Sequence, residues 1–275
     1  MKFFYDYFQP SDVCGIYTWG HLFTVVAFVL SMVAAFFLSR KMTEKGVGRL
    51  QWIVAIAVTV MEIVKIALKA IKGDPATQWM PLYYCSIFIV AIWLTLTNVK
   101  VLTKIGYAYI CMGGILASLF FSIYPSTSLG MYPLWHPSVW HSFVYHWLMF
   151  YTGVMIMWKK GYKAKPVDSL YYLVIVLLFS VISMIVNPLV RDGNGMFLGQ
   201  PFALPIFLAV YNFNKGLYIA MMVFAQGIGL FWLSFGLDLL VKKLLSLSKT
   251  KKQDTPPTET EEEDEEAAEV VDQNS

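Results

Sequence analysis

Residues 20–38 read GHLFTVVAFVLSMVAAFFL and contain no Asp, Glu, Lys or Arg. A helix needs about 20 mostly apolar residues to cross the hydrocarbon core of a bilayer, and this stretch has that length. Its apolar residues occur all round the predicted helix rather than along one stripe, which is typical of a helix between lipid and other helices. The stretch therefore predicts a transmembrane helix.

Six further apolar runs of similar length follow along the chain. They cover residues 51–71, 82–99, 105–123, 140–158, 169–187 and 217–241. The composition agrees, because 57% of the 275 residues are hydrophobic and 14% are charged, whereas soluble domains have about 45–50% and about 25%. We therefore predict an all-α, multi-pass transmembrane bundle of about seven spans, and we exclude a soluble domain.

The positively charged residues predict the orientation of these spans. Fifteen lysines and arginines follow the odd-numbered spans, whereas four lie on the opposite side. Positively charged connections stay in the cytoplasm, so the N-terminus is expected outside and the C-terminus inside. The apolar segment Met196–Tyr211 is short and is broken by Pro201 and Pro205. Because a crossing there would invert the last span, we expect a re-entrant or interfacial segment before that span.

The chain divides into three predicted regions. Residues 1–19 form an extracytoplasmic leader, residues 20–241 the transmembrane domain, and residues 242–275 a basic juxtamembrane segment followed by an acidic tail. All 21 lysines and arginines lie at or before Lys252, and ten of the 18 acids follow it. The tail is expected to be disordered in the cytoplasm and available to cations or a basic partner. The expected location is the cell membrane.

Ionisable residues inside the predicted spans are the first functional candidates, since such groups are costly at membrane depth. Glu62, Lys65 and Lys69 share one helix face, which favours either a Glu62–Lys65 ion pair or a site for an ion or lipid headgroup. The four histidines all fall on the predicted outer side. They are His21, His136, His141 and His146. His141 and His146 are five residues apart and point in different directions, so no metal site is expected.

One thiol and one imidazole have matching depths. Cys85 lies about one turn into the third predicted span, and His146 about two turns into the fifth from the same side. A neutral imidazole can activate a thiol without adding permanent charge to the bilayer. The pair is therefore a candidate nucleophile and base, with inert packing of the cysteine as the alternative.

Several short motifs resemble the YwaF-type bacterial integral membrane proteins. They are the segment from Pro81 to Ile87 (PLYYCSI), the histidine-containing stretch His141–Gly153, Asn194–Leu198 (NGMFL) and Trp19-Gly20-His21. The likeness covers roughly residues 15–240. That family is similar in turn to the eukaryotic transmembrane acyltransferase that moves polyunsaturated acyl chains onto ether phospholipids. The resemblance implies that Cys85 matches a proposed cysteine nucleophile and His146 a proposed catalytic histidine.

Two functions follow as hypotheses. In the first, the protein is a phospholipid acyltransferase in which Cys85 forms a thioester, His146 transfers protons and helix dipoles or Asn194 stabilise the oxyanion. In the second, it is a non-enzymatic transporter, channel or lipid-binding protein with a polar cavity. The residues expected to bind substrate or support the site are His21, Glu62, Lys65, His141 and Asn194. The chain has no cofactor motif, so none is expected, and the expected partners are membrane phospholipids and no nucleic acid.

Overall fold

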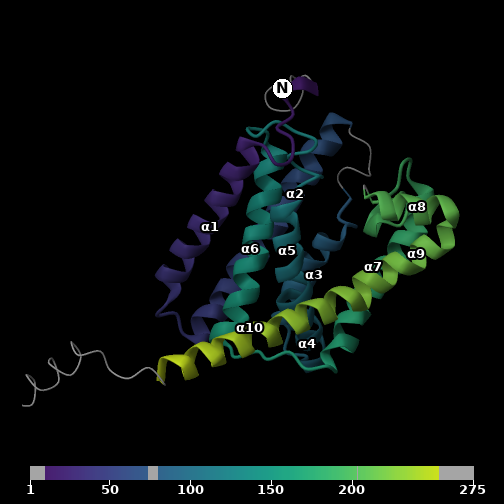
Figure 1. The fold of residues 1–275 in the computed structure, drawn as a ribbon. Coiled ribbons are helices and arrows are strands. Elements are labelled where there is room, and N and C mark those ends of the chain that lie inside the picture. Colours follow the sequence, from purple (N-terminus) through teal and green to yellow (C-terminus); the bar gives the residue numbers. More distant parts are fainter. Residues whose placement is uncertain (1–9, 74–79, 203, 254–275) are drawn as a thin grey trace, which may run out of the picture. The chain divides into compact units, whose positions relative to one another are not determined.

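The computed structural model describes residues 10–73, 80–202 and 204–253, and every regular element in these ranges is helical. The chain forms two units, Met1–Ser234 and Phe235–Ser275. The first unit contains the α-helices α1 to α9, the beginning of α10 and, among its described residues, six short 3₁₀ or π segments (Figure 1). The α-helices are α1 (Trp19–Ser39), α2 (Glu44–Lys72), α3 (Ile87–Thr95), α4 (Lys100–Ala108), α5 (Ile115–Ile123), α6 (Pro137–Lys159), α7 (Asp168–Val186), α8 (Pro205–Phe213), α9 (Lys215–Phe224) and α10 (Leu230–Gln253).

The short segments continue or join these helices. The 3₁₀ turns are η1 (Pro10–Asp12), η3 (Tyr84–Ser86), η5 (Asn187–Leu189) and η6 (Gly195–Phe197), and the π segments are η4 (Tyr109–Gly114) and η7 (Ala225–Gly229). The segment η4 joins α4 to α5, and η7 joins α9 to α10, so each set forms one long helix. A π turn inside an α-helix displaces backbone carbonyls from their usual partners and is frequent at functional sites.

Four helical stretches are long and apolar enough to cross a membrane. They are Trp19–Ser39, Lys100–Ile123, Asp168–Leu189 and Lys215–Leu244. The other three predicted spans also fall on helices, namely α2, α6 and the shorter apolar helix Tyr84–Thr95. The all-helical membrane fold is therefore confirmed, whereas seven crossings and their orientation stay predictions.

Side-chain caps fix where several of these helices begin. The hydroxyl oxygens of Thr18 and Thr43 accept the third backbone N–H of α1 and α2, respectively. At the start of α6, Nδ1 of His136 accepts the N–H of Ser138, and a proline occupies the first helical position. Such caps satisfy the N–H groups that a helix end leaves without intrahelical partners.

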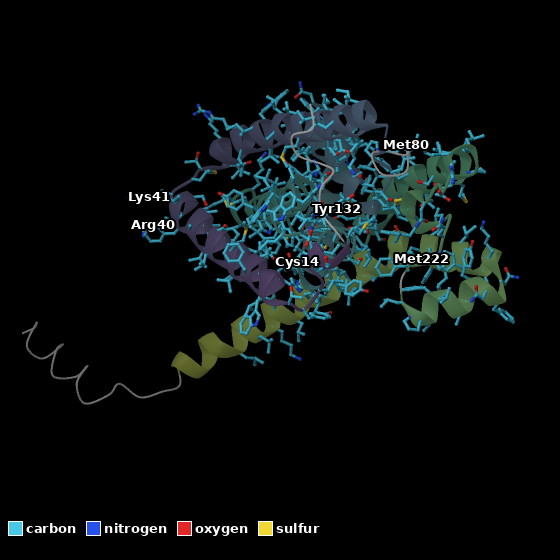
Figure 2. The ribbon with its side chains drawn as sticks, turned by 90° about the horizontal axis from the view of Figure 1, so that it is seen from above. Cys14, Arg40, Lys41, Met80, Tyr132 and Met222 are labelled. Carbon is cyan, nitrogen blue, oxygen red and sulfur yellow. The ribbon has the colours of Figure 1, made fainter. Side chains whose placement is uncertain are left out.

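The core of the first unit lies around α6. This helix packs against α2, α5 and the π segment η4, and α4 packs against α3 and α7. By contrast, α1 touches α5 and α6 on one side and leaves most of its apolar residues exposed (Figure 1). Arg40 and Lys41 follow α1 at the margin of the bundle (Figure 2). The second helix of the chain, α2, packs against α3 and α6.

The segment Met196–Tyr211 includes no membrane-spanning helix among its described residues. It contains the end of η6 and most of α8, which has nine residues. At 1.5 Å per residue α8 extends about 14 Å, less than half of a bilayer core. A helix of this length is compatible with a re-entrant or interfacial segment, which stays a prediction.

The second unit is described up to residue 253. It contains the remainder of α10, where Lys242 Nζ pairs with Asp238 Oδ2 at 2.5 Å. The predicted disordered acidic tail, residues 254–275, lies outside the described residues.

Candidate functional site

Cys85 occupies the 3₁₀ turn η3 at the head of α3, and three carbonyl groups around it are bonded to other parts of the fold. The carbonyl of Leu82 accepts the N–H of Met196 at 2.7 Å. The carbonyl of Tyr84 accepts the hydroxyl of Tyr109 at 2.5 Å, and that of Cys85 accepts the hydroxyl of Tyr145 at 3.1 Å. The backbone that carries the thiol is therefore held from three directions.

Three ionisable side chains gather beside this turn, and we call Glu62, Lys65 and His141 the charged cluster. The Glu62 carboxylate forms an ion pair with Lys65 one turn later on α2. Its second oxygen lies 3.8 Å from Nε2 of His141 on α6. The exposed fraction of the Glu62 side chain is 8%, whereas that of Lys65 is 20%. A carboxylate this buried needs compensating partners, which the lysine and the imidazole provide.

The charged cluster is connected to Cys85 in two ways. Cys85 lies within electrostatic range of both Glu62 and Lys65. The ring of His141 stacks at 6.2 Å on Tyr145, whose hydroxyl holds the Cys85 carbonyl. Nε2 of His141 is buried without a hydrogen-bond partner among the described residues. This nitrogen is therefore available to a further group in the site.

His146 lies on another face of α6. Its Nδ1 donates to the carbonyl of Ser142 at 2.7 Å, one turn earlier. Its ring stacks on Phe121 of α5, with 3.9 Å between ring centroids. No hydrogen bond joins His146 to Cys85 in the part of the chain that the structure describes. The ring of Tyr145, whose hydroxyl holds the Cys85 carbonyl, lies beside both histidines, with 5.7 Å between ring centroids for His146 and 6.2 Å for His141.

Both ring nitrogens of His21 form hydrogen bonds with backbone groups. Nε2 donates to the carbonyl of Ser122 at 2.8 Å, and Nδ1 accepts the backbone N–H of Tyr17 at 3.1 Å. This pattern requires the neutral imidazole with its proton on Nε2. His21 therefore ties the start of α1 to the end of α5, away from the charged cluster.

Lys69 continues the polar face of α2 beyond the charged cluster. Its Nζ lies 3.4 Å from the hydroxyl of Tyr132, and the residue is buried. Tyr132 in turn stacks on His136, the residue that caps α6. Figure 2 shows Tyr132 toward the middle of the bundle. Lys69 is therefore held inside the unit.

The other two cysteines lie in ordinary packing environments. The Cys111 thiol lies 3.8 Å from the carbonyl of Gly153, and the residue is 1% exposed. The Cys14 sulfur lies 3.4 Å from the Thr18 hydroxyl, close to the start of α1. Among the three, Cys85 alone adjoins the charged cluster within the described residues. All three thiols are free.

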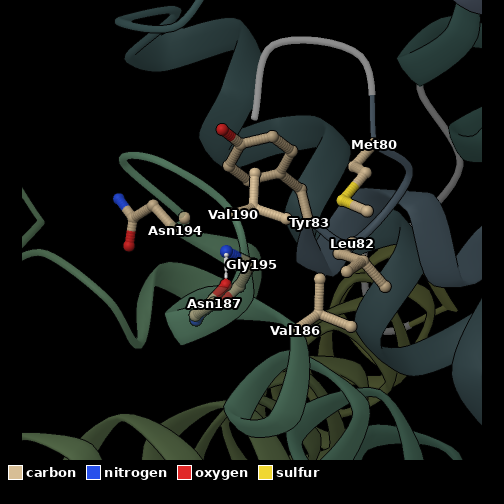
Figure 3. Close-up of a pocket in the computed structure, with 9 residues that line it drawn as sticks. Met80, Leu82, Tyr83, Val186, Asn187, Val190, Asn194 and Gly195 are labelled. Carbon is tan, nitrogen blue, oxygen red and sulfur yellow. Dashed lines mark hydrogen bonds between the residues drawn. The ribbon is translucent and has the colours of Figure 1, made fainter. Parts of the chain in front are cut away.

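The NGMFL segment forms a tight loop against the Cys85 turn. The Asn187 amide pairs with both the N–H and the carbonyl of Gly195, at 2.7 and 3.1 Å (Figure 3). The side-chain oxygen of Asn194 accepts the N–H groups of Gly199 and Gln200, and its amide points away from the other lining residues in Figure 3. Asn194 thus stabilises its own loop.

A pocket separates this loop from the chain just before Cys85. Its lining residues are Met80, Leu82, Tyr83, Val186, Asn187, Val190, Gly193, Asn194 and Gly195 (Figure 3). Most of this surface is apolar side chain or backbone. No group of three or more metal-ligating side chains occurs within residues 10–73, 80–202 and 204–253.

A buried polar chain lies behind Cys85, and it was not found from the sequence. The hydroxyls of Tyr84 and Tyr172 form a hydrogen bond, and Tyr172 also donates to the carbonyl of Gln226 at 2.9 Å. The amide of Gln226 donates to the carbonyl of Met196 at 2.9 Å. A glutamine within the last apolar run was the available signal, because a buried amide needs partners.

Comparison with known proteins identifies the family. The TMEM164 family model matches residues 16–233, a range that includes Cys85, the charged cluster and the NGMFL loop. No curated protein and no solved structure matches the chain. The family match covers most of the sequence, and the fold has helices apolar enough to cross a bilayer. The protein therefore belongs to the TMEM164 family and is a membrane protein.

Proposed function

We propose that the protein is a membrane-embedded phospholipid acyltransferase that works through a thioester on Cys85. The observation that carries the proposal is the position of half-buried Cys85 within electrostatic range of Glu62 and Lys65, with its carbonyl held by Tyr145, whose ring stacks on His141. Ionisable side chains inside a membrane protein are costly and serve function by default. The resemblance of residues 81–87 to the YwaF-type proteins, and through them to an ether-phospholipid acyltransferase, supports the same chemistry.

The proposed base is His141, supported by Glu62, in place of His146. In the first step His141 takes the thiol proton while the Cys85 sulfur attacks the ester carbonyl of a phospholipid. The tetrahedral intermediate collapses to the thioester, and the leaving lysophospholipid oxygen takes the proton from His141. The hydroxyl of an acceptor lysophospholipid then loses its proton to His141 and attacks the thioester. Cys85 leaves as thiolate and recovers the proton.

The other members of the charged cluster have distinct proposed roles. Glu62 holds the imidazole in position and balances its charge when it is protonated, as a carboxylate does for a catalytic histidine. Lys65 supplies the positive charge that stabilises the tetrahedral oxyanion. Asn194 has no part in this scheme, because its side-chain oxygen is bonded within its own loop and its amide group points away from the other residues that line the pocket in Figure 3.

The proposal is tested by acyl transfer in membranes that contain the wild-type chain, Cys85→Ala, His141→Ala or His146→Ala. We expect no transfer with Cys85→Ala, and a loss of about 100-fold with His141→Ala, since a positioned base contributes 10²–10⁴. His146→Ala is the matched control and should retain activity within about threefold if its imidazole only packs against Phe121. Unchanged transfer with Cys85→Ala contradicts the proposal, and a greater loss with His146→Ala restores His146 as the base.

A non-enzymatic function is the second candidate, and it is favoured by the buried Glu62 and Lys69 and the partly buried Lys65. Such residues also line polar pathways in transporters and channels. Lipid analysis of cells that lack the protein, beside cells with Cys85→Ala, separates the two candidates. A shared change in phospholipid acyl chains supports the enzyme, whereas changed solute uptake with normal lipids supports transport.

A further inference from the structure

Gln226 stands at the centre of the buried polar chain behind Cys85. It lies in the π segment η7 between α9 and α10, and the residue is buried. Its side-chain nitrogen donates to the carbonyl of Met196, and its main-chain carbonyl accepts the hydroxyl of Tyr172, both at 2.9 Å. A single residue of the last long helix is therefore bonded both to the NGMFL loop and to α7.

The first route from Gln226 to Cys85 passes through Met196. The N–H of Met196 donates to the carbonyl of Leu82 at 2.7 Å, three residues before the thiol. Met196 has φ of 51°, a left-handed conformation that a residue with a side chain adopts only when its surroundings require it. The hydrogen bonds at its N–H and at its carbonyl hold Met196 in this conformation. Loss of the bond from the Gln226 amide should therefore free the loop to move.

The second route passes through two tyrosines. The single hydroxyl proton of Tyr172 goes to the Gln226 carbonyl, so the Tyr84 hydroxyl is the donor in the Tyr84–Tyr172 pair. Tyr84 is the residue immediately before Cys85, and its own carbonyl is held by Tyr109. The two routes thus end on Leu82 and Tyr84, which both precede the thiol in one short segment.

We infer that Gln226 is a positioning residue for Cys85, which acts through Met196 and Tyr172 to hold the Leu82–Cys85 segment in its reactive place. The inference deepens the proposed acyl transfer and rests on it for the kinetic measurement. Gln226 touches neither the thiol nor the charged cluster in the described structure. Its effect is therefore on the geometry of attack and not on proton transfer.

The test compares Gln226→Met with Gln51→Met in the full-length protein reconstituted in phospholipid nanodiscs. Gln51 is the matched control, because it is a buried glutamine whose amide donates at 2.8 Å to Thr95, at the opposite end of α3 from Cys85. We expect Gln226→Met to lower kcat about tenfold, since small misplacements of reacting groups have effects of this size, with KM within about twofold. Gln51→Met should leave both constants within about twofold.

A second measurement does not depend on acyl transfer. The rate at which a hydrophobic maleimide modifies Cys85, relative to Cys111, should rise about fivefold in Gln226→Met and in Tyr172→Phe, because the released segment admits the bulky reagent. The ratio should not change in Gln51→Met. If Cys85→Ala shows no loss of acyl transfer, the proposed function fails, and the modification ratio still decides the role of Gln226.

Three results overturn the inference. The first is an unchanged modification ratio in both Gln226→Met and Tyr172→Phe. The second is an equal change in Gln51→Met. The third is unfolding of both Gln226→Met and Tyr172→Phe under conditions in which Gln51→Met stays folded, because the residues are then structural supports of the whole bundle.

Discussion

Gly113 shows how a single residue makes room for the polar chain behind Cys85. A Cβ atom at this position would lie 2.2 Å from the Tyr84 hydroxyl oxygen and 2.6 Å from Cε2 of Tyr172. Both tyrosine rings are buried, so they cannot swing into solvent to make space. Glycine is therefore required here by close packing and not by backbone conformation.

Gly113→Ala should accordingly destabilise the protein by about 1–3 kcal/mol, the usual effect of overpacking a core. Gly48→Ala is the control, because nothing lies within 4 Å of the added Cβ on α2 and alanine favours a helix by about 0.5–1 kcal/mol. Thermal unfolding in one detergent measures both. Equal unfolding temperatures for the two variants would contradict the prediction, because the tyrosines would then move without lowering the free energy of unfolding.

Lys65 and Glu62 form the ion pair on which the charged cluster depends. Lys65→Met leaves the Glu62 carboxylate buried with only the imidazole of His141 at 3.8 Å. Loss of one partner of a buried pair costs about 3–5 kcal/mol, and protonation of His141 should reduce that cost. The double variant Glu62→Gln/Lys65→Met should be more stable than Lys65→Met alone. Additive losses in the double-mutant cycle would contradict this coupling.

The sequence predicted the helices of this protein better than its site. Apolar runs mark membrane helices because lipid offers no partner for the backbone, so length and composition locate such elements. Depth along a helix follows from residue number, and it placed Cys85 and His146 at similar heights. Direction round the helix depends on which neighbours pack where. His146 faces Phe121 of α5 while His141 faces Glu62 of α2, and no residue pattern in α6 distinguishes the two.

The loop between α7 and α8 shows the same limit at the scale of an element. Its hydrogen bonds from Gly195 to Asn187 and from Met196 to Leu82 are donated by backbone N–H groups. Such bonds depend on the path of the backbone and not on the type of side chain at the donor. Sequence motifs indicated that the NGMFL segment matters, and the sequence left Asn194 and helix dipoles as alternatives for stabilising the oxyanion. The observed bonds give the connecting role to Met196, whose side chain carries no polar hydrogen to suggest it.

Gly199→Ala tests whether this loop supports the Cys85 turn. The added Cβ would lie 1.8 Å from the carbonyl oxygen of Gly193, so the loop must move. We expect the Met196–Leu82 hydrogen bond to be lost. The free energy of unfolding should fall by about 1–3 kcal/mol, and the unfolding temperature should fall with it. Gly229→Ala is the control, since the nearest atom to its added Cβ is 3.9 Å away. Amide hydrogen exchange at Met196 reports the bond directly, and unchanged protection there would contradict the prediction.

At the scale of the whole molecule, the uneven distribution of lysine and arginine makes the orientation testable. Single cysteines at Lys163 and Arg191 fall on opposite sides of the predicted topology. A membrane-impermeant thiol reagent should modify Arg191→Cys in intact cells and Lys163→Cys only after permeabilisation. The other thiols are replaced in both variants. Modification of Lys163→Cys from outside would reverse the orientation, and modification of both would require a different number of crossings.

The buried polar face of α2 has a consequence for how the protein is made. A lysine at the centre of a membrane helix adds about 2.5–3.5 kcal/mol to the apparent free energy of insertion, and α2 carries Glu62, Lys65 and Lys69. The partner that compensates Glu62 from outside α2 is on α6, which the ribosome completes only after α3, α4 and α5. If α2 crosses the membrane as predicted, we expect it to stay beside the translocation machinery, or partly outside the bilayer, until α6 has been made. Substitutions in α6 that delay its docking should then reduce the amount of protein that escapes degradation, even where the finished fold tolerates them.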